Sequence, residues 1–204
     1  MKEYDFIAIG DTVIDAFIRL KDAEAHCDVD GKNCKLIMDF GAKIPYEAVH
    51  ELPAVGNSAN ASVAAARLGL SSALITNIGD DMYGEKCITH LKDDGVSTEY
   101  VVRHEGKKTN YHYVLWFQDE RTILIKHESY NYSLPTHMAP PKWIYLSSFG
   151  KDGEGLHDTI AEYLQKHPAV KLAFQPGTFQ LKLGLERLKA LYAHTEVFVC
   201  NVEE

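Results

Sequence analysis

Residues 55–79, VGNSANASVAAARLGLSSALITNIG, indicate a helix followed by a buried strand. Asn57 or Ser58 can cap the first turn, and the alanines after them favour a helix body. Gly69 suits the left-handed position just beyond a helix end. Residues 72–78 form an apolar, β-branched run that stops at a glycine, which predicts a strand in the interior of a sheet.

The alternation of strands and helices continues on both sides of this stretch. Further strands are predicted at 4–9, 143–147, 170–175 and 196–200, and further helices at 83–94, 155–167 and 180–192. Strands that alternate with helices are joined by right-handed crossovers and build a parallel sheet. The fold class predicted from this rhythm is α/β, with a central, mostly parallel sheet flanked by helices.

Two regions do not fit this rhythm. An extended segment is predicted at 13–20, and a strand–turn–strand hairpin is predicted at 111–127. These regions, about 13–55 and 108–128, are expected to form a small separate sheet over one edge of a single α/β domain that spans 1–204.

The composition is that of an ordinary folded protein. The chain has 204 residues, of which 46% are hydrophobic and 25% charged, and this excludes collagen-like, disordered and disulfide-scaffold classes. The 21 Lys and Arg against 29 Asp and Glu give a net charge of −8, which argues against a nucleic-acid partner. The apolar runs are too short for a membrane span, and the first predicted strand leaves no room for a signal peptide.

The cysteines and histidines are candidates for metal or redox groups. Residues 21–53 are polar and predicted to be irregular, and the His, Cys and Asp residues between 26 and 34 match no usual zinc spacing, so a polar loop is preferred. His112 and His127 are interpreted as solvated or packed members of the hairpin. The cysteines show no close paired spacing, which predicts reduced thiols and a cytoplasmic location: Cys27, Cys34, Cys87 and Cys200.

Polar clusters follow several of the predicted strands. Ligands of an open parallel sheet bind beyond the carboxyl ends of its strands. Asp11 and Asp15 follow the first strand, and their carboxylates suit the adjacent hydroxyls of a sugar. The alternative is that Asp11 caps a turn and Asp15 faces solvent.

The helix start at Gly56 is a second candidate binding feature. Backbone N–H groups point outward there, and Asn57 and Asn60, three residues apart, share a face and can present both amides to one ligand. Ordinary capping is the alternative for Asn57, but it does not explain Asn60.

The sequence lacks both a dinucleotide-binding glycine fingerprint and a P-loop.

Taken in order, these clusters resemble the ribokinase-like (PfkB) family of carbohydrate and nucleoside kinases. GDTVID at 10–15 is similar to the family's first substrate-binding segment. Residues 55–69 resemble its first signature, with valine in place of the first of two glycines. IGDDMYG at 78–84 is similar to the marker that shapes a turn and a helix start, and NVEE at 201–204 is similar to the Asn-x-x-Glu motif.

The resemblance implies ATP-dependent transfer of a phosphoryl group to a hydroxyl of a small sugar-like substrate. It implies that Asp15, Asn57 and Asn60 hold the substrate, beside Asp11 and Gly56. It also implies that the small sheet is a lid, whose closure excludes water.

The cofactors implied by the resemblance are ATP and Mg²⁺. Asn201 and Glu204 occupy the positions that organise magnesium and phosphate, and Glu204 would act on the metal through water. The family's general base and most of its ATP pocket follow the Asn-x-x-Glu motif, so they are expected beyond Glu204. The chain is therefore expected to be a C-terminally truncated form that is inactive alone.

Two other functions are retained as alternatives. One is a nucleoside kinase of the same family, because the first motifs are shared, and the other is a non-catalytic sugar-binding or regulatory remnant. Trp116 and Phe117 in the hairpin are candidates either for a homodimer contact or for covering the substrate.

Overall fold

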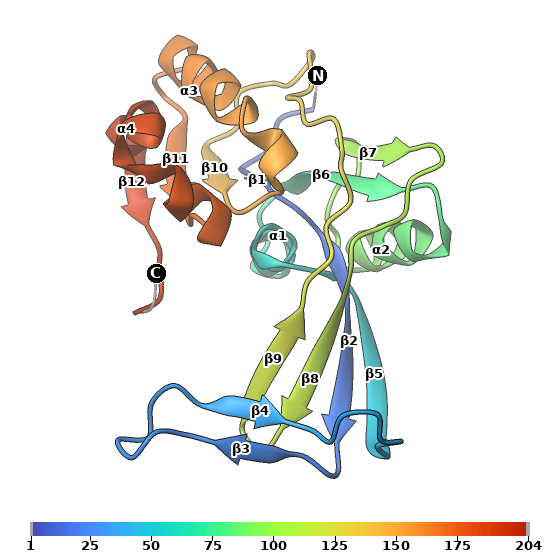
Figure 1. Ribbon diagram of the computed structural model, residues 1–204. Helices are drawn as coiled ribbons and strands as arrows, with labels where there is room; N and C mark the ends of the chain where they lie inside the picture. Colours follow the sequence, from blue (N-terminus) through green and yellow to red (C-terminus); the bar gives the residue numbers. More distant parts are fainter. Residues whose placement is uncertain (1, 203–204) are drawn as a thin grey trace. The chain divides into compact units, whose positions relative to one another are not determined.

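The computed structural model describes residues 2–202, and the chain divides into two compact units that are described separately (Figure 1). The larger, which we call the α/β unit, comprises the chain up to Val13, Pro53–Asn110 and the chain from His127 onward. The smaller, which we call the β unit, comprises Ile14–Leu52 and Tyr111–Lys126.

The α/β unit is built on a six-stranded sheet in the order β12-β11-β10-β1-β6-β7. Every neighbouring pair in this sheet is parallel, as the alternation of strands and helices predicted. The strands are β1 (Phe6–Ile9), β6 (Ser72–Gly79), β7 (Val101–His104), β10 (Trp143–Leu146), β11 (Lys171–Phe174) and β12 (Thr195–Phe198).

Helices cover both faces of this sheet. They are α1 (Asn57–Arg67), α2 (Met82–Asp93), α3 (Leu156–Lys166) and α4 (Thr178–His194), with a 3₁₀ turn η1 at Lys151–Gly153. Ile7 and Ile9 of β1 pack into a buried cluster with Ile160 of α3 and Leu188 of α4. Because side chains alternate along a strand, Ala8 points to the opposite face, where α1 contacts β1 and β6.

The start of α1 differs from the sequence prediction. Neither Asn57 nor Ser58 caps the helix: Gly56 is the N-cap residue, and no side chain caps it. Ser58 is diverted because its hydroxyl donates instead to the backbone carbonyl of Asp11, at 2.9 Å. The predicted stop is confirmed, since Gly69 has a φ of 88° just beyond the helix.

The β unit contains the predicted small separate sheet. Its strand order is β5-β2-β8-β9, with β2 and β8 parallel and β8 and β9 forming the predicted antiparallel hairpin. A further two-stranded sheet joins β3 and β4. The strands are β2 (Val13–Leu20), β3 (Glu24–His26), β4 (Lys35–Ile37), β5 (Tyr46–Val55), β8 (Tyr111–Phe117) and β9 (Glu120–Leu124).

The prediction of four unpaired cysteines is wrong. Cys27 and Cys34 form a disulfide, with their Cα atoms 3.9 Å apart. The antiparallel register pairs His26 with Lys35. Cys27 directly follows His26 and Cys34 directly precedes Lys35, so the two cysteines face each other across the hairpin. Cys87 is buried, which raises the pKa of its thiol to about 11, and Cys200 is exposed.

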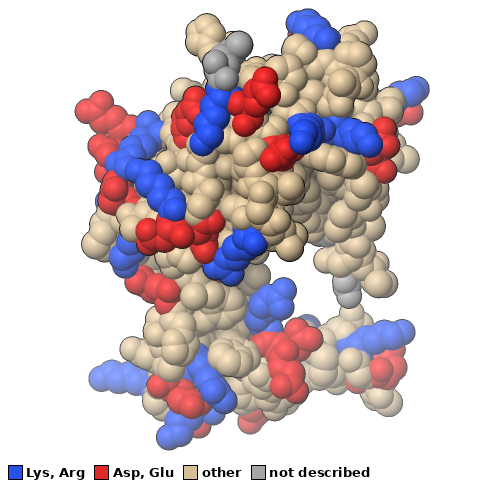
Figure 2. Space-filling model, turned by 180° about the vertical axis from the view of Figure 1, so that it is seen from behind, with Lys and Arg blue, Asp and Glu red and all other residues tan. Residues whose placement is uncertain are grey.

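Figure 2 shows acidic and basic side chains interspersed over one face of the molecule, without a large area of a single sign. Some of the exposed charges are paired, as where Arg187 lies 2.7 Å from Asp158. Within residues 2–202, no helix has the length and apolar character needed to cross a membrane.

Candidate functional site

The carboxyl ends of β1 and β10 form the switch point of the α/β sheet. After β1 the chain forms β6, which neighbours β1 on one side in the sheet. It later forms β10, which neighbours β1 on the other side. Ligands of open α/β sheets bind at such points. Here the backbone N–H of Asp11, after β1, donates to the carbonyl of Ser148, after β10, at 2.9 Å, so the two strand ends are joined.

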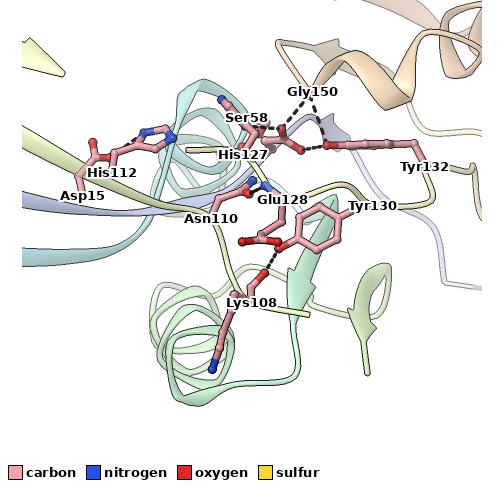
Figure 3. A network of polar contacts seen from close by, with 11 residues as sticks. Asp15, Ser58, Lys108, Asn110, His112, His127, Glu128, Tyr130, Tyr132 and Gly150 are labelled. Atoms are coloured by element: carbon pink, nitrogen blue, oxygen red, sulfur yellow. Dashed lines mark hydrogen bonds and ion pairs between the residues drawn. The ribbon is translucent and has the colours of Figure 1, made fainter. Parts of the chain in front are cut away.

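The Asp11 carboxylate is held on both of its oxygens. Oδ1 accepts from the Tyr132 hydroxyl at 2.8 Å, and Oδ2 accepts from the backbone N–H of Gly150 at 2.9 Å (Figure 3). Nδ1 of His127 lies 3.3 Å from Oδ2, and the Asp11 side chain is only 5% exposed. Burial, together with the negative charge of Asp11, raises the pKa of Tyr132 above its ordinary value and keeps its hydroxyl a donor.

Gly56 allows α1 to begin close to the backbone of Asp11. Its φ is 112°, a conformation that favours glycine, and a Cβ there would lie 2.9 Å from the carbonyl oxygen of Asp11. Asn57 and Asn60 are both exposed on the first turn of the helix. The structure therefore places Asp11, Gly56, Asn57 and Asn60 at one end of the α/β sheet, with Asp11 as the buried member.

The IGDDMYG segment has the turn-shaping role that the resemblance implies. Asp81 caps α2 by accepting from the Gly84 N–H at 2.9 Å, and it also accepts from the Thr109 hydroxyl at 2.6 Å. Burial opposes ionisation of Asp81, but these hydrogen bonds outweigh it and lower the pKa of the carboxyl. A Cβ on Gly79 would lie 2.3 Å from the backbone of Lys108, so this position requires glycine.

The two segments through which the chain leaves and re-enters the α/β unit are tied together. The Glu128 N–H donates to Oδ1 of Asn110 at 2.8 Å, and the Tyr130 hydroxyl donates to the carbonyl of Lys108 at 2.5 Å (Figure 3). Asn110 is fully buried. These bonds fix the position of His127, which precedes Glu128 and contacts Asp11.

Asp15 lies in the β unit, opposite His112 (Figure 3). The two residues are register partners on β2 and β8, and Nδ1 of His112 lies 3.3 Å from Oδ1 of Asp15. Their side chains are 20% (Asp15) and 12% (His112) exposed.

The Asn-x-x-Glu segment, to which the resemblance gives a role with magnesium, is described only in part. Asn201 is exposed beyond β12, and Glu204 lies outside the described residues. An amide oxygen and a carboxylate are hard oxygen donors of the kind that Mg²⁺ accepts, so the donor set fits this ion chemically. The cluster between 26 and 34 does not, since its two thiols form a disulfide, and among residues 2–202 no group of three or more His, Cys, Asp and Glu could hold a metal.

Sequence reasoning missed the residues that hold the two aspartates. His112 and His127 were interpreted as ordinary hairpin members, yet each lies against an aspartate. Their positions at the two ends of one hairpin were a usable signal, because those ends return to the α/β unit. Tyr132 and Gly150 left no such signal, since both lie in irregular segments far along the chain from Asp11.

Comparison with known proteins identifies the family. The model of the pfkB family carbohydrate kinases matches residues 39–204. The chain belongs to the PfkB family of carbohydrate kinases.

Relatives of this PfkB chain include proteins named as a ribokinase and as a sugar kinase. It is 40% identical to the ribokinase of Bacillus subtilis over 73 residues, which are 35% of this chain and 25% of that protein. It is 27% identical to an uncharacterized sugar kinase of Archaeoglobus fulgidus over 150 residues, which are 68% of this chain and 57% of that protein. The PfkB chain thus spans at most about three-fifths of these two relatives.

Solved structures show the same fold. A ribokinase of Cryptococcus neoformans, in complex with ADP, superposes with a TM-score of 0.66 at 22% identity over 97% of this chain and 56% of that one. A nucleoside kinase of Methanocaldococcus jannaschii superposes with a TM-score of 0.68 at 14% identity over 95% of this chain and 60% of that one. At these identities the likeness establishes the ribokinase fold for the PfkB chain.

Proposed function

We propose that the protein to which this chain belongs transfers a phosphoryl group from ATP to a hydroxyl of a small sugar. The observation that carries the proposal is the position of the start of α1 at the sheet's switch point. Gly56 lets the helix begin in close contact with the Asp11 carbonyl, and the side chains of Asn57 and Asn60 are exposed there. Membership of the PfkB family supports the reaction class. The ADP-bound ribokinase with the same fold supports ATP as the donor.

Different residues have different roles in this proposal. Asp15, Asn57 and Asn60 accept and donate hydrogen bonds to sugar hydroxyls, and Gly56 lets the ligand approach the backbone. Asp11 is proposed to belong to the same site. Its carboxylate also holds the turn after β1 in place, because it accepts from Tyr132 and from the backbone of Gly150.

Asn201 and Glu204 are proposed to organise Mg²⁺ and the phosphates of ATP. A bound Mg²⁺ neutralises charge on the transferring phosphoryl group. The side chains position that ion through water, a mode that suits a cation reluctant to lose its hydration shell.

The β unit is proposed to be the lid that shields the reaction from water. Trp116 and Phe117 remain candidates for covering the sugar or for a homodimer contact. A cytoplasmic location also belongs to this proposal. Cellular reductants there would act on the exposed pair Cys27–Cys34, so the disulfide would be in exchange with two thiols.

The test is titration of the full-length protein with pentoses, hexoses and nucleosides, followed by measurement of sugar-dependent ADP release. We expect one sugar class to bind and to stimulate ADP release. Stimulation by nucleosides alone would establish a nucleoside kinase, and binding without ADP release would establish a non-catalytic remnant. Either result would overturn the proposal.

A matched pair of variants locates the sugar site. Asn60→Ala should weaken sugar binding about fivefold, since a neutral hydrogen bond contributes about 1 kcal/mol. It should leave the stability of α1 intact, because alanine is the better helix former. Ala61→Ser, the next residue of the helix, is the control and should leave sugar affinity unchanged.

A further inference from the structure

The pair of Asp15 and His112 is built into the pairing of two strands. β2 and β8 run parallel, and their register sets Asp15 opposite His112, with Phe17 opposite Val114 two residues further along. Residues opposite each other in a sheet share a face, so the carboxylate and the imidazole project side by side. The Nδ1–Oδ1 separation of 3.3 Å follows from this backbone arrangement.

The carboxylate of Asp15 needs a donor at this place. Its side chain is 20% exposed, so it has lost much of its hydration, and a carboxylate withdrawn from water must be compensated by donors or positive charge. His112 places a basic side chain beside it, with Nδ1 at 3.3 Å from Oδ1.

Arg19, Tyr111 and Arg121 on the neighbouring strands have other partners or positions. Arg19, four residues along β2 on the same face, lies 3.1 Å from Glu47 and stacks over Trp116 at 5.0 Å. On β8, the hydroxyl of Tyr111 donates to Glu51 at 2.6 Å. On β9, register pairs Arg121 with Trp116, beyond the Asp15 end of the strands.

We propose that His112 is a positioning residue for Asp15. The inference rests on the proposed function, in which Asp15 accepts a hydrogen bond from a sugar hydroxyl. His112 donates its Nδ1–H to Oδ1, which fixes the rotation of the carboxylate and leaves Oδ2 for the substrate. The carboxylate in turn selects the imidazole tautomer that carries its proton on Nδ1.

The distance fits a contact that tightens when substrate binds. At 3.3 Å it lies just beyond the ordinary N–H···O range. Hydrogen bonds of a binding site are often long before the ligand is present and shorten in the complex. A small rotation of either side chain closes the gap once a sugar hydroxyl engages the second oxygen.

Amide substitutions distinguish positioning from mere packing. The amide nitrogen of asparagine can take the place of Nδ1, whereas that of glutamine reaches the place of Nε2. If His112 only filled space between β2 and β8, the longer glutamine would replace it at least as well. If it positions Asp15 through Nδ1, asparagine is the better substitute.

The experiment measures sugar affinity and steady-state kinetics of the full-length protein for His112→Ala, His112→Asn and His112→Gln. We expect His112→Ala and His112→Gln to weaken sugar affinity about tenfold, the effect of losing a hydrogen bond to a charged group. His112→Asn should stay within about threefold of the parent. KM for the sugar should change more than kcat, and KM for ATP should stay constant.

Two controls separate this inference from the proposed function. Tyr113→Ala alters the neighbouring residue of β8, whose side chain points to the other face, and should leave sugar affinity unchanged. Asp15→Asn should weaken sugar binding by itself, and His112→Gln added to it should cost little more, because the two groups act as one unit.

The outcomes are distinct. Equal losses for His112→Asn and His112→Gln, or additive effects of the Asp15 and His112 changes, would overturn the positioning role. Unchanged affinity in Asp15→Asn would instead overturn the proposed substrate contact. If His112→Ala does not fold, the comparison between the two amide variants still decides, since both keep a polar side chain of similar size.

Discussion

The backbone N–H of Gly150 donates to Oδ2 of Asp11 at 2.9 Å, across 139 residues of sequence. This bond joins the loop after β1 to the loop after β10. The Tyr132 hydroxyl occupies the other carboxylate oxygen, so one buried side chain ties three separate segments of the α/β unit.

Replacement of Asp11 by Asn should therefore destabilise the fold. Asparagine keeps the shape, but its NH₂ group faces one of the two donors and leaves it unpaired. Loss of hydrogen bonds to a buried charged group costs about 2–3 kcal/mol in the free energy of unfolding, measured by urea denaturation.

Tyr132→Phe is the matched control for this variant. It removes one of the donors and leaves the Gly150 bond, so its cost should be about half that of Asp11→Asn. Equal stability of Asp11→Asn and the parent protein would show that the carboxylate does not hold these segments together.

Gly56→Ala should destabilise α1 and weaken sugar binding together. Gly56 has a φ of 112°, and a Cβ would lie 2.9 Å from the Asp11 carbonyl oxygen. Strained backbone costs about 1–3 kcal/mol, and the contact forces the helix start away from β1.

The control for the Gly56 variant is Gly69→Ala. Gly69 also has a positive φ, of 88°, but a Cβ there meets nothing within 4 Å. Gly69→Ala should therefore lower the free energy of unfolding only by the strain of the left-handed conformation, about 1–2 kcal/mol, and should leave sugar affinity unchanged. Equal sugar affinities in both variants would remove the Gly56 approach from the binding site.

The sequence predicts the strands and helices that are buried and periodic. β2 was predicted at residues 13–20, where the structure has it, and β6 and α2 are within one residue of their predicted ends. β5 was not predicted, because most of its residues are exposed and Pro53 lies within it. β7 at the sheet edge is short and largely exposed, so it carries little periodic signal.

The candidate site was predictable only where it is local in sequence. Gly56, Asn57 and Asn60 fall in one helical turn, so their spacing alone indicates a shared face. The partners of Asp11 come from residues 127–150, and nothing in the pattern around Tyr132 or Gly150 points back to the first strand. The disulfide was missed for a different reason: Cys27 and Cys34 are close in sequence, but their pairing depends on the register of two three-residue strands, β3 and β4, which are too short to give a periodic pattern.

Reduction of Cys27–Cys34 should loosen the hairpin of β3 and β4. A two-stranded sheet of this length is only marginally stable by itself. The disulfide closes a loop of eight residues, and on the chain-entropy account this cross-link stabilises the folded hairpin by about 2.5 kcal/mol. We expect limited proteolysis to cut between residues 27 and 34 faster when dithiothreitol is present.

The double variant Cys27→Ser/Cys34→Ser tests the assignment. It should be cut, without reductant, at the rate of the reduced parent, and reductant should have no further effect on it. Cys200→Ser is the control and should respond to reductant as the parent does. Cutting rates independent of reductant in the parent would contradict a stabilising disulfide.

The stability of the α/β unit should fall as the pH is lowered below about 6.5, in part because of His157. This residue of α3 is 1% exposed, and burial lowers its pKa below the ordinary value, outweighing the opposing effect of its hydrogen bond with the Glu154 carbonyl. The unfolded chain therefore binds a proton that the folded protein does not. The stabilising contribution of neutral His157 is fully present above the unfolded pKa and is lost as the pH falls toward the folded pKa.

His157→Leu, which keeps a similar volume without a titrating group, should flatten this dependence. The free energy of unfolding, measured from pH 5 to 8, should fall less steeply in the variant, by up to about 1.4 kcal/mol per pH unit. His137→Gln, which alters an exposed histidine, is the control for the loss of an imidazole. Parallel curves for the parent and His157→Leu would mean that His157 takes up no additional proton on unfolding.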